Sequence, residues 1–361
     1  MNRRRFAHLS ALTLAASRLP GQTESPVGYA AIGLGTISDI FMKAVAQTKS
    51  SRITALVTGH PETKGKKYAA MYGIPESSIY TYETFDRIRE NKAVDAVYVG
   101  LPNSMHCDFT VRAAAAGKHV LCEKPMAISS AECRTMIEAC RRADRKLMVA
   151  YRIQYDPTWN AAAKLIADGE LGRIESFSGG WWTQMPVGQW RMTKALGGGG
   201  SLMDLGIYPL NAIRFLVRGV AGGEPTAFTA QVATTDHESG RFKEVEQSLV
   251  WTMQWKSGLQ AACSSSYGQR GLGFLDVHAE KGWLRFEPAY YYDGARLTGM
   301  VGERKIDMGP GGQAPFQFAL EADHFSDCIR NNRQPKSPGE DGLGDLLAIE
   351  SIYKAAGTPI A

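Results

Sequence analysis

A glycine-rich turn between an apolar run and a helical stretch constrains the fold of this chain more than any other feature. The run Tyr29–Ile32 leads into the G-x-G-x-x-S sequence of residues 33–38, and residues 37–47 follow a helical pattern. Between a strand and a helix, the glycines permit a tight turn and let the main chain approach a pyrophosphate, while the helix N-terminus offers amide groups to the phosphates. The pattern therefore predicts a dinucleotide-binding unit. Its predicted cofactor contacts are Gly33, Gly35, Thr36 and Ile37.

The residues after the second strand favour NADP over NAD. Residues 52–57 are typical of a buried strand, and no Asp or Glu lies between Ser51 and His60 to hold the ribose 2′-hydroxyl of NAD. Thr58 instead offers a hydroxyl, and three lysines follow at positions 64, 66 and 67. Because a hydroxyl and cations suit a 2′-phosphate, we predict NADP, with Thr58 and Lys64 as contacts. The alternative is that at least two of the lysines lie on the solvated face of the next helix.

Alternating strand and helix patterns continue to residue 150 and predict a doubly wound parallel sheet, a Rossmann domain over residues 27–150. Strands are expected at 79–80, 96–99, 119–122 and 147–150, and helices at 61–72, 84–90, 109–116 and 129–143. The loops after strands 96–99 and 119–122 lie at carboxyl ends, where open α/β sheets bind their ligands. His106 is assigned to the site with the alternative that it caps the next helix. The predicted contacts there are Leu101, Pro102, Asn103, His106, Glu123 and Lys124.

The second half of the chain predicts an α+β domain over residues 151–361, with a large, mostly antiparallel open sheet. After a helix at 159–168, a strand at 174–182 and a helix at 202–216, strand-like runs recur at 227–235, 245–255, 259–267, 274–279 and 283–286. Helices at 318–330 and 343–356 end the chain. Along residues 245–252 both alternating sets contain apolar side chains. We therefore expect a homodimer or homotetramer built through this sheet.

Residues 1–22 resemble a twin-arginine export signal, which predicts a periplasmic enzyme. Arg3, Arg4, Arg5 and Phe6 precede an apolar run at residues 7–16 that is too short to cross a bilayer. The formal net charge is +5, but without the four arginines of residues 1–22 the chain has 37 basic and 36 acidic residues. Nucleic acid is therefore not a predicted partner, nor is a membrane after export. The alternative is a disordered basic N-terminus.

The six cysteines form no C-x-x-C pair, so no metal site is predicted.

Several motifs in order resemble the Gfo/Idh/MocA oxidoreductases, and among them glucose–fructose oxidoreductase and related periplasmic aldose oxidoreductases. They are the glycine turn, Leu-Pro-Asn-Ser-x-His at residues 101–106, Gly-Lys-His-Val-x-Cys-Glu-Lys-Pro at 117–125, and the segment 198–208 that ends in Asp204-x-x-x-Tyr208. The resemblance runs from residue 28 to the C-terminus. It implies an NADP-dependent enzyme that oxidises a cyclic aldose to its lactone, with recycling of tightly bound cofactor on a second sugar as an extension.

The resemblance also implies roles for individual residues. Asp204 and Tyr208 share one helix face, being four residues apart. Tyr208 would be the acid/base, Lys124 would orient and polarise the hydroxyl, and Asp204 would position it. A tyrosine titrates near ~10, so a nearby cation is needed to favour the phenolate. Trp181 and Trp182 would line the same wall, with a structural role in the sheet as the alternative for one of them. Arg152, Tyr155, Trp190 and Arg191 resemble substrate-side residues, and Arg152, Trp190 and Arg191 are also assigned to the cofactor.

Two other functions remain open at the level of sequence. Members of the same family hydrolyse glycosides with NAD, which the missing acid after the second strand disfavours. A non-catalytic sugar-binding protein would not need the set Lys124, Asp204 and Tyr208. One departure from glucose–fructose oxidoreductase is the absence of a long proline-rich arm, since only about residues 21–26 separate the leader from the first strand. Permanent retention of NADP is therefore in doubt.

Overall fold

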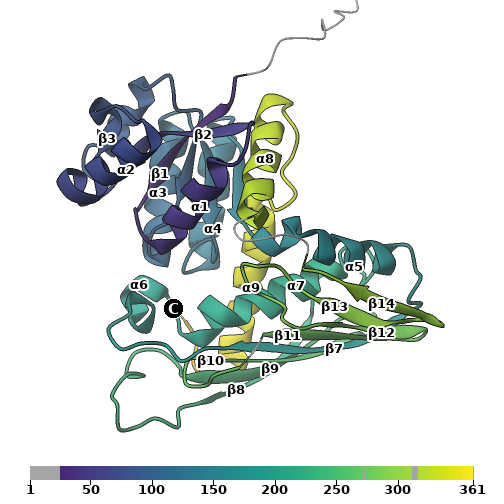
Figure 1. The fold of residues 1–361 in the computed structure, drawn as a ribbon. Helices are drawn as coiled ribbons and strands as arrows, with labels where there is room; N and C mark the ends of the chain where they lie inside the picture. Colours follow the sequence, from purple (N-terminus) through teal and green to yellow (C-terminus); the bar gives the residue numbers. More distant parts are fainter. Residues whose placement is uncertain (1–24, 272, 311–315, 361) are drawn as a thin grey trace, which may run out of the picture.

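Two separate sheets organise the residues that the computed structural model describes, which are 25–271, 273–310 and 316–360. The predicted signal peptide at residues 1–22 lies outside them. One sheet has six strands and the other eight, and helices pack between and beside them (Figure 1). In the described residues no helix is both long and apolar enough to cross a membrane.

The six-strand sheet is parallel throughout and has the order β3-β2-β1-β4-β5-β6. Because β1 lies between β2 and β4, the strand order reverses beside it, and the carboxyl ends of β1 and β4 flank a crevice suited to a ligand. The Rossmann fold that the sequence predicts is confirmed. The strands are β1 Val27–Ile32, β2 Ser51–Val57, β3 Ile79–Tyr80, β4 Ala96–Val99, β5 His119–Glu123 and β6 Leu147–Ala150.

Helices cover both faces of this sheet. The helices are α1 Thr36–Val45, α2 Lys66–Tyr72, α3 His106–Ala115 and α4 Ser130–Arg142. Phe41 of α1 and Tyr68 of α2 join one apolar cluster, and Phe109 of α3 and Met136 of α4 join another. The predicted helix at 61–72 begins as a wide π-helical turn, Pro61–Gly65, and the one at 84–90 is a 3₁₀ helix, Phe85–Glu90.

The eight-strand sheet has the order β14-β13-β12-β11-β7-β10-β9-β8, and its strands are antiparallel except for the pair β7 and β10. The mostly antiparallel second sheet is thus confirmed, with two strands that the sequence did not predict, β13 and β14. The strands are β7 Ile174–Trp182, β8 Ala227–Ala233, β9 Ser248–Gln254, β10 Gln260–Ser266, β11 Phe274–Ala279, β12 Gly282–Phe286, β13 Leu297–Val301 and β14 Arg304–Met308.

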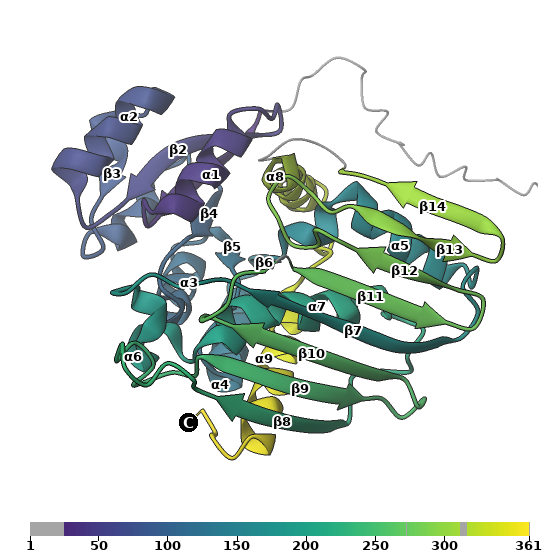
Figure 2. The same ribbon diagram turned by 60° about the horizontal axis from the view of Figure 1, so that its bottom comes forward.

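Helices cover one face of this second sheet and leave the other face open (Figure 2). The covering helices include α5 Pro157–Ala167 and α7 Ile207–Leu216, and the short helix α6 Lys194–Gly197 lies at its edge. Leu249, Trp251 and Met253 of β9 are buried, whereas Val250 between them is 51% exposed. Only one of the two alternating sets along β9 therefore belongs to the core.

The last two helices of the chain pack back against the first sheet. Helix α8, Phe316–Arg330, lies against α1, and α9, Gly339–Ala355, lies against α4. The Tyr29 hydroxyl on β1 is 2.9 Å from Ser326 Oγ on α8. The strands of the six-strand sheet end by residue 150, and those of the eight-strand sheet begin at residue 174. Part of the C-terminal segment nevertheless completes the packing of the six-strand sheet.

Candidate active site

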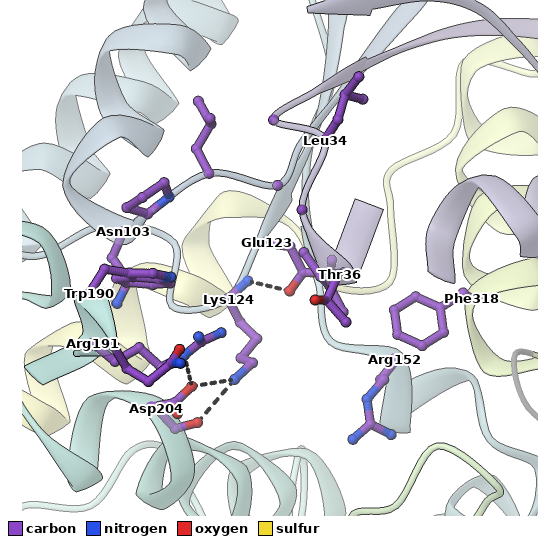
Figure 3. A pocket seen from close by; sticks show the side chains of 18 of the residues that line it. Leu34, Thr36, Asn103, Glu123, Lys124, Arg152, Trp190, Arg191, Asp204 and Phe318 are labelled. Carbon is purple, nitrogen blue, oxygen red and sulfur yellow. Dashed lines mark hydrogen bonds and ion pairs between the residues drawn. The ribbon is translucent and has the colours of Figure 1, made fainter. Parts of the chain in front are cut away.

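A cavity of about 650 Å³ opens at the carboxyl ends of the parallel strands and extends to the helix that carries Asp204 and Tyr208 (Figure 3). Its wall combines the glycine turn after β1, the loops after β2, β4, β5 and β6, and residues 181–191. Tyr292 and Phe318 close another side. The cavity therefore lies where both halves of the chain can contribute side chains.

The glycine turn forms a cradle that fits a dinucleotide. Gly33 has a φ of +81°, and a Cβ there would lie 2.6 Å from the main-chain oxygen of Gly100. A Cβ on Gly35 would meet no protein atom within 4 Å, so this position faces open space. The N-terminus of α1 has no side-chain cap. Its amide groups are thus available to a pyrophosphate, as the sequence motif predicts.

Four side chains line the end of the cavity beyond β2: Thr58, His60, Lys64 and Tyr82. Thr58 and Lys64 were predicted there. The other two lysines do not line the cavity. Lys66 pairs with Glu62 at 2.8 Å, and Lys67 lies over the ring of Tyr68. His60 was not singled out, although it follows β2 by only three residues.

The loops after β4 and β5 form the middle of the cavity. Leu101, Pro102, Asn103 and Glu123 line it as predicted. The Asn103 amide nitrogen donates to the main-chain oxygen of Gly197 at 2.9 Å, which joins this loop to the turn before Asp204. Glu123 accepts a hydrogen bond from the Tyr98 hydroxyl at 2.5 Å, and burial raises the pKa of the Glu123 carboxyl.

Asp204 lies between two cations at the inner end. Its Oδ1 atom is 3.2 Å from Arg191 Nε and 3.6 Å from Lys124 Nζ, and Lys124 also donates to the main-chain oxygen of Asp204 at 3.0 Å (Figure 3). Burial opposes ionisation of Asp204, but the charges of Arg191 and Lys124 outweigh it and hold the pKa of this carboxyl below its usual range. Asp204 is therefore a carboxylate at neutral pH.

Tyr208 follows Asp204 by one helical turn and presents its ring to Lys124. The Lys124 Nζ atom lies 4.3 Å from the ring centre, and the ring of Trp181 meets Tyr208 edge to face at 4.5 Å. Arg152 donates from its Nη2 atom to the Tyr208 hydroxyl at 3.4 Å. The predicted set Lys124, Asp204 and Tyr208 thus converges on one region of the cavity.

Arg152, Trp190 and Arg191 also line the cavity, and the guanidinium of Arg191 lies over the Trp190 ring at 4.4 Å. Arg152 is fixed by Gln317, whose side-chain oxygen it approaches to 2.5 Å. All three predicted residues therefore belong to the wall of the cavity.

Two predicted site residues, Tyr155 and His106, lie outside the cavity. Tyr155 ends the 3₁₀ turn Arg152–Tyr155 and points behind β6, where its hydroxyl is 3.0 Å from Ser337 Oγ. Its assignment as a substrate contact is therefore wrong. The ring nitrogens of His106 each lie 2.9 Å from a main-chain oxygen, one of Leu101 and the other of Pro125. His106 ties the two loops together and is not a cofactor contact.

Three aromatic residues of the wall were missed by sequence reasoning: Tyr82, Tyr292 and Phe318. Tyr292 is the third residue of the run Tyr290-Tyr291-Tyr292, and Phe318 lies in the first turn of α8. A run of three tyrosines just after a proline is a signal that could have been used for Tyr292, whereas Phe318 resembles any apolar helix residue. Of the two neighbouring tryptophans, Trp181 lines the cavity.

The described residues contain no cluster of three His, Cys, Asp or Glu side chains placed to hold a metal ion. All six cysteines are free thiols.

Comparison with known proteins identifies relatives of this chain. Residues 27–151 match the family model for the oxidoreductase family with an NAD-binding Rossmann fold, GFO_IDH_MocA, and residues 159–285 match the GFO/IDH/MocA C-terminal domain. D-xylose 1-dehydrogenase [NADP(+)] of Haloarcula marismortui is 32% identical over 93% of this chain and 92% of its own length. The crystal structure of aldose-aldose oxidoreductase from Caulobacter crescentus, complexed with glycerol, is 45% identical, with a TM-score of 0.86 over 92% of this chain and 98% of that one. The 1,5-anhydro-D-fructose reductase of Ensifer adhaerens is 27% identical over 91% of this chain and 95% of its own length.

Proposed function

Because the chain belongs to the GFO/IDH/MocA family of oxidoreductases, we propose that it oxidises the anomeric hydroxyl of a cyclic aldose to a lactone with NADP. The observation that carries the proposal is the convergence of Lys124, Asp204 and Tyr208 beside a dinucleotide cradle in one cavity. The relatives support it, because one is an NADP-dependent xylose dehydrogenase and another an aldose–aldose oxidoreductase.

Bound NADP supplies the acceptor for the hydride. Gly35 and the open N-terminus of α1 would hold its pyrophosphate, and Thr58, His60 and Lys64 would hold the 2′-phosphate. A carboxylate would repel that phosphate, and none lines this end of the cavity among the described residues. NADP should therefore be preferred to NAD.

The chain's own residues manage the sugar hydroxyl. Lys124 is hydrogen-bonded to the main-chain oxygen of Asp204 and can donate a further hydrogen bond to the reacting oxygen. Asp204, ionised between two cations, accepts a hydrogen bond from a neighbouring sugar hydroxyl. Tyr208 accepts the proton of the anomeric hydroxyl, and Trp181 offers an aromatic face to the sugar C–H groups.

The test is an assay of purified protein with a panel of aldoses, following NADPH formation by absorbance and lactone by trapping with hydroxylamine. We expect both products with NADP, and a lower kcat/KM with NAD. Hydrolysis of an aryl glycoside with no lactone would replace this proposal by the glycoside hydrolase. Sugar binding that leaves NADP unreduced would replace it by a sugar-binding protein.

Recycling of bound cofactor belongs to the same proposal, supported by the similarity to an aldose–aldose oxidoreductase. Protein denatured after purification should release nicotinamide cofactor, and pairs of sugars should be interconverted without added NADP. Cofactor-free protein that needs added NADP in every turnover would contradict recycling while leaving the dehydrogenase reaction intact.

Export to the periplasm and self-association complete the proposal. The motif Arg3-Arg4-Arg5-Phe6 directs export, so replacing all three arginines by lysine should retain the protein in the cytoplasm.

The open face of the eight-strand sheet, with Val250 and Phe274 lining a shallow hollow, is the proposed contact between copies. Sedimentation should give a dimer or tetramer, and a monomer at micromolar concentration would contradict it.

A further inference from the structure

Arg152 is a buried cation whose hydrogen bonds, in the described part of the chain, all go to neutral groups. It is 3% exposed. Its Nη1 atom donates to the side-chain oxygen of Gln317 at 2.5 Å and to the main-chain oxygen of Tyr291 at 3.2 Å, and its Nη2 atom donates to the main-chain oxygen of Tyr290. The Nε atom has no hydrogen-bond partner. A buried charge in this state is costly unless an opposite charge neutralises it.

The carboxyls that act on Arg152 do so from a distance and are poor counter-ions. They are Glu123 and Glu321, neither of which is within ion-pair distance of the guanidinium in the described structure. Burial raises the pKa of both carboxyls, and the charge of Glu123 raises that of Glu321 further. Both carboxyls are therefore harder to ionise than a carboxyl in water, and neither forms an ion pair with Arg152 in the described structure. The guanidinium can therefore still stabilise another anion beside it.

The polar group of the reaction centre nearest to Arg152 is the hydroxyl of Tyr208, 3.4 Å from Nη2. Lys124 occupies a different position, over the face of the Tyr208 ring at 4.3 Å and bonded to Asp204. The other groups around this tyrosine are Asp204 one turn before it, Tyr292, whose pKa burial and Tyr208 raise, and the rings of Trp181 and Tyr290.

We propose that Arg152 is a positioning residue that stabilises the phenolate of Tyr208 and so sets the pH above which Tyr208 can act as base. The inference rests on the proposed function, because it takes Tyr208 to be the proton acceptor. When the sugar is oxidised, the C–H bond gives its electron pair to NADP as hydride and the hydroxyl proton passes to the phenolate oxygen. Arg152 donates to that oxygen before the transfer and remains beside the neutral phenol after it.

The orientation of Arg152 is built from the C-terminal part of the chain. Gln317 donates from its side-chain nitrogen to Asp156 Oδ2 at 2.6 Å, which turns its oxygen toward Arg152. The main-chain oxygen of Tyr291 accepts from the same Nη1 atom as Gln317, and the main-chain oxygen of Tyr290 accepts from Nη2. A planar guanidinium suits such a set of acceptors, and a lysine would fill only part of it.

The first experiment follows phenolate directly by ultraviolet difference titration and needs no sugar. The difference between parent and Tyr208→Phe isolates the ionisation of Tyr208 from that of the other tyrosines. In Arg152→Gln its midpoint should rise by about one to three pH units, the range for loss of a neighbouring opposite charge. Arg152→Lys keeps the charge and should shift it less. An unchanged midpoint in a folded Arg152→Gln variant, or equal shifts in both variants, would overturn the proposal. If Arg152→Gln does not fold, the Arg152→Lys variant decides. A midpoint in Arg152→Lys equal to that of the parent would overturn the proposal, because losing the guanidinium geometry should cost part of the stabilisation.

The second experiment measures kcat against pH. In Arg152→Gln the rising limb of the profile should move to higher pH by the same amount as the titration midpoint. Below this limb, kcat should be about tenfold lower than that of the parent for each pH unit of the shift. At high pH, kcat should recover to within a few-fold of the parent. In the Tyr208→Phe background, Arg152→Gln should leave the shape of the profile unchanged. A loss of kcat that is equal at every pH would show a merely structural role. If the parent oxidises no aldose, the proposed function fails, while the titration still decides the pairing of Arg152 with Tyr208.

Discussion

At the scale of single residues, the hydroxyl of Tyr208 is the group whose removal separates chemistry from packing. Tyr208→Phe loses one long hydrogen bond, to Arg152 at 3.4 Å, and keeps the edge contact with Trp181. We expect an almost unchanged melting temperature and a fall in kcat on the order of 10²–10⁴-fold, the usual contribution of general acid–base catalysis. Tyr290→Phe is the matched control, since its hydroxyl donates to the Phe274 main chain at 3.3 Å outside the cavity. Turnover within a few-fold of the parent in Tyr208→Phe would remove it from the reaction.

Most of the site could be predicted at this scale because its residues follow strands or stand at fixed helical spacing. The glycine turn, Lys124 at the end of β5, and the pair Asp204 and Tyr208 all have that property. Tyr155 and His106 could not be placed in the same way. The direction in which a side chain leaves a single 3₁₀ turn, or the first turn of a helix, depends on neighbours far along the chain, such as Ser337 and Pro125.

At the scale of elements, the start of the helix that carries Asp204 and Tyr208 is held by one carboxylate. Glu246 accepts hydrogen bonds from the main-chain nitrogens of Gly200 and Leu202, both at 2.9 Å, and from the Tyr353 hydroxyl at 2.9 Å. A Cβ on Gly200 would lie 2.4 Å from the main-chain oxygen of Glu246, which explains a glycine here. Glu246→Gln replaces an accepting oxygen by a donor, so we expect a loss of about 1–3 kcal/mol in unfolding free energy and a lower kcat. The control is Glu238→Gln, which should change neither, because Glu238 is exposed and makes no hydrogen bond or ion pair within the described residues. Equal denaturation midpoints for the two variants would contradict this role.

The elements that the sequence did not reveal are those whose pattern is set by contacts. Strand β14, Arg304–Met308, buries only Ile306 among charged neighbours. Strand β13 contains Gly299, where a Cβ would lie 2.2 Å from the main-chain oxygen of Trp283. Glycine disfavours a strand by its own propensity, yet here the close approach of β12 requires it.

At the scale of the whole molecule, the C-terminal helix α8 completes the core of the N-terminal sheet. Phe325 is fully buried in the same cluster as Tyr29 of β1. We expect Phe325→Ala to cost about 3–5 kcal/mol and to lower the melting temperature in a single transition. The reason is that α8 belongs to the N-terminal core and, through Gln317, also bonds to Arg152 and Asp156 in the segment after β6. Leu320→Ala, on the same helix but 43% exposed, should have little effect. Calorimetry that resolved two transitions, with only one of them shifted, would show that the halves unfold separately.

The hydrogen bond from Asn103 to Gly197 connects the part of the cavity proposed for the cofactor with the part proposed for the sugar. Asn103 belongs to the loop beneath the cofactor, and Gly197 to the turn that leads into Asp204. A bound dinucleotide that fixed the loop would also restrict the turn, and less ordering entropy would then remain for the sugar subsite to lose. By linkage, the factor by which the cofactor tightens sugar binding must equal the factor by which the sugar tightens cofactor binding. Through this one contact, each ligand would therefore change the affinity for the other by the same factor.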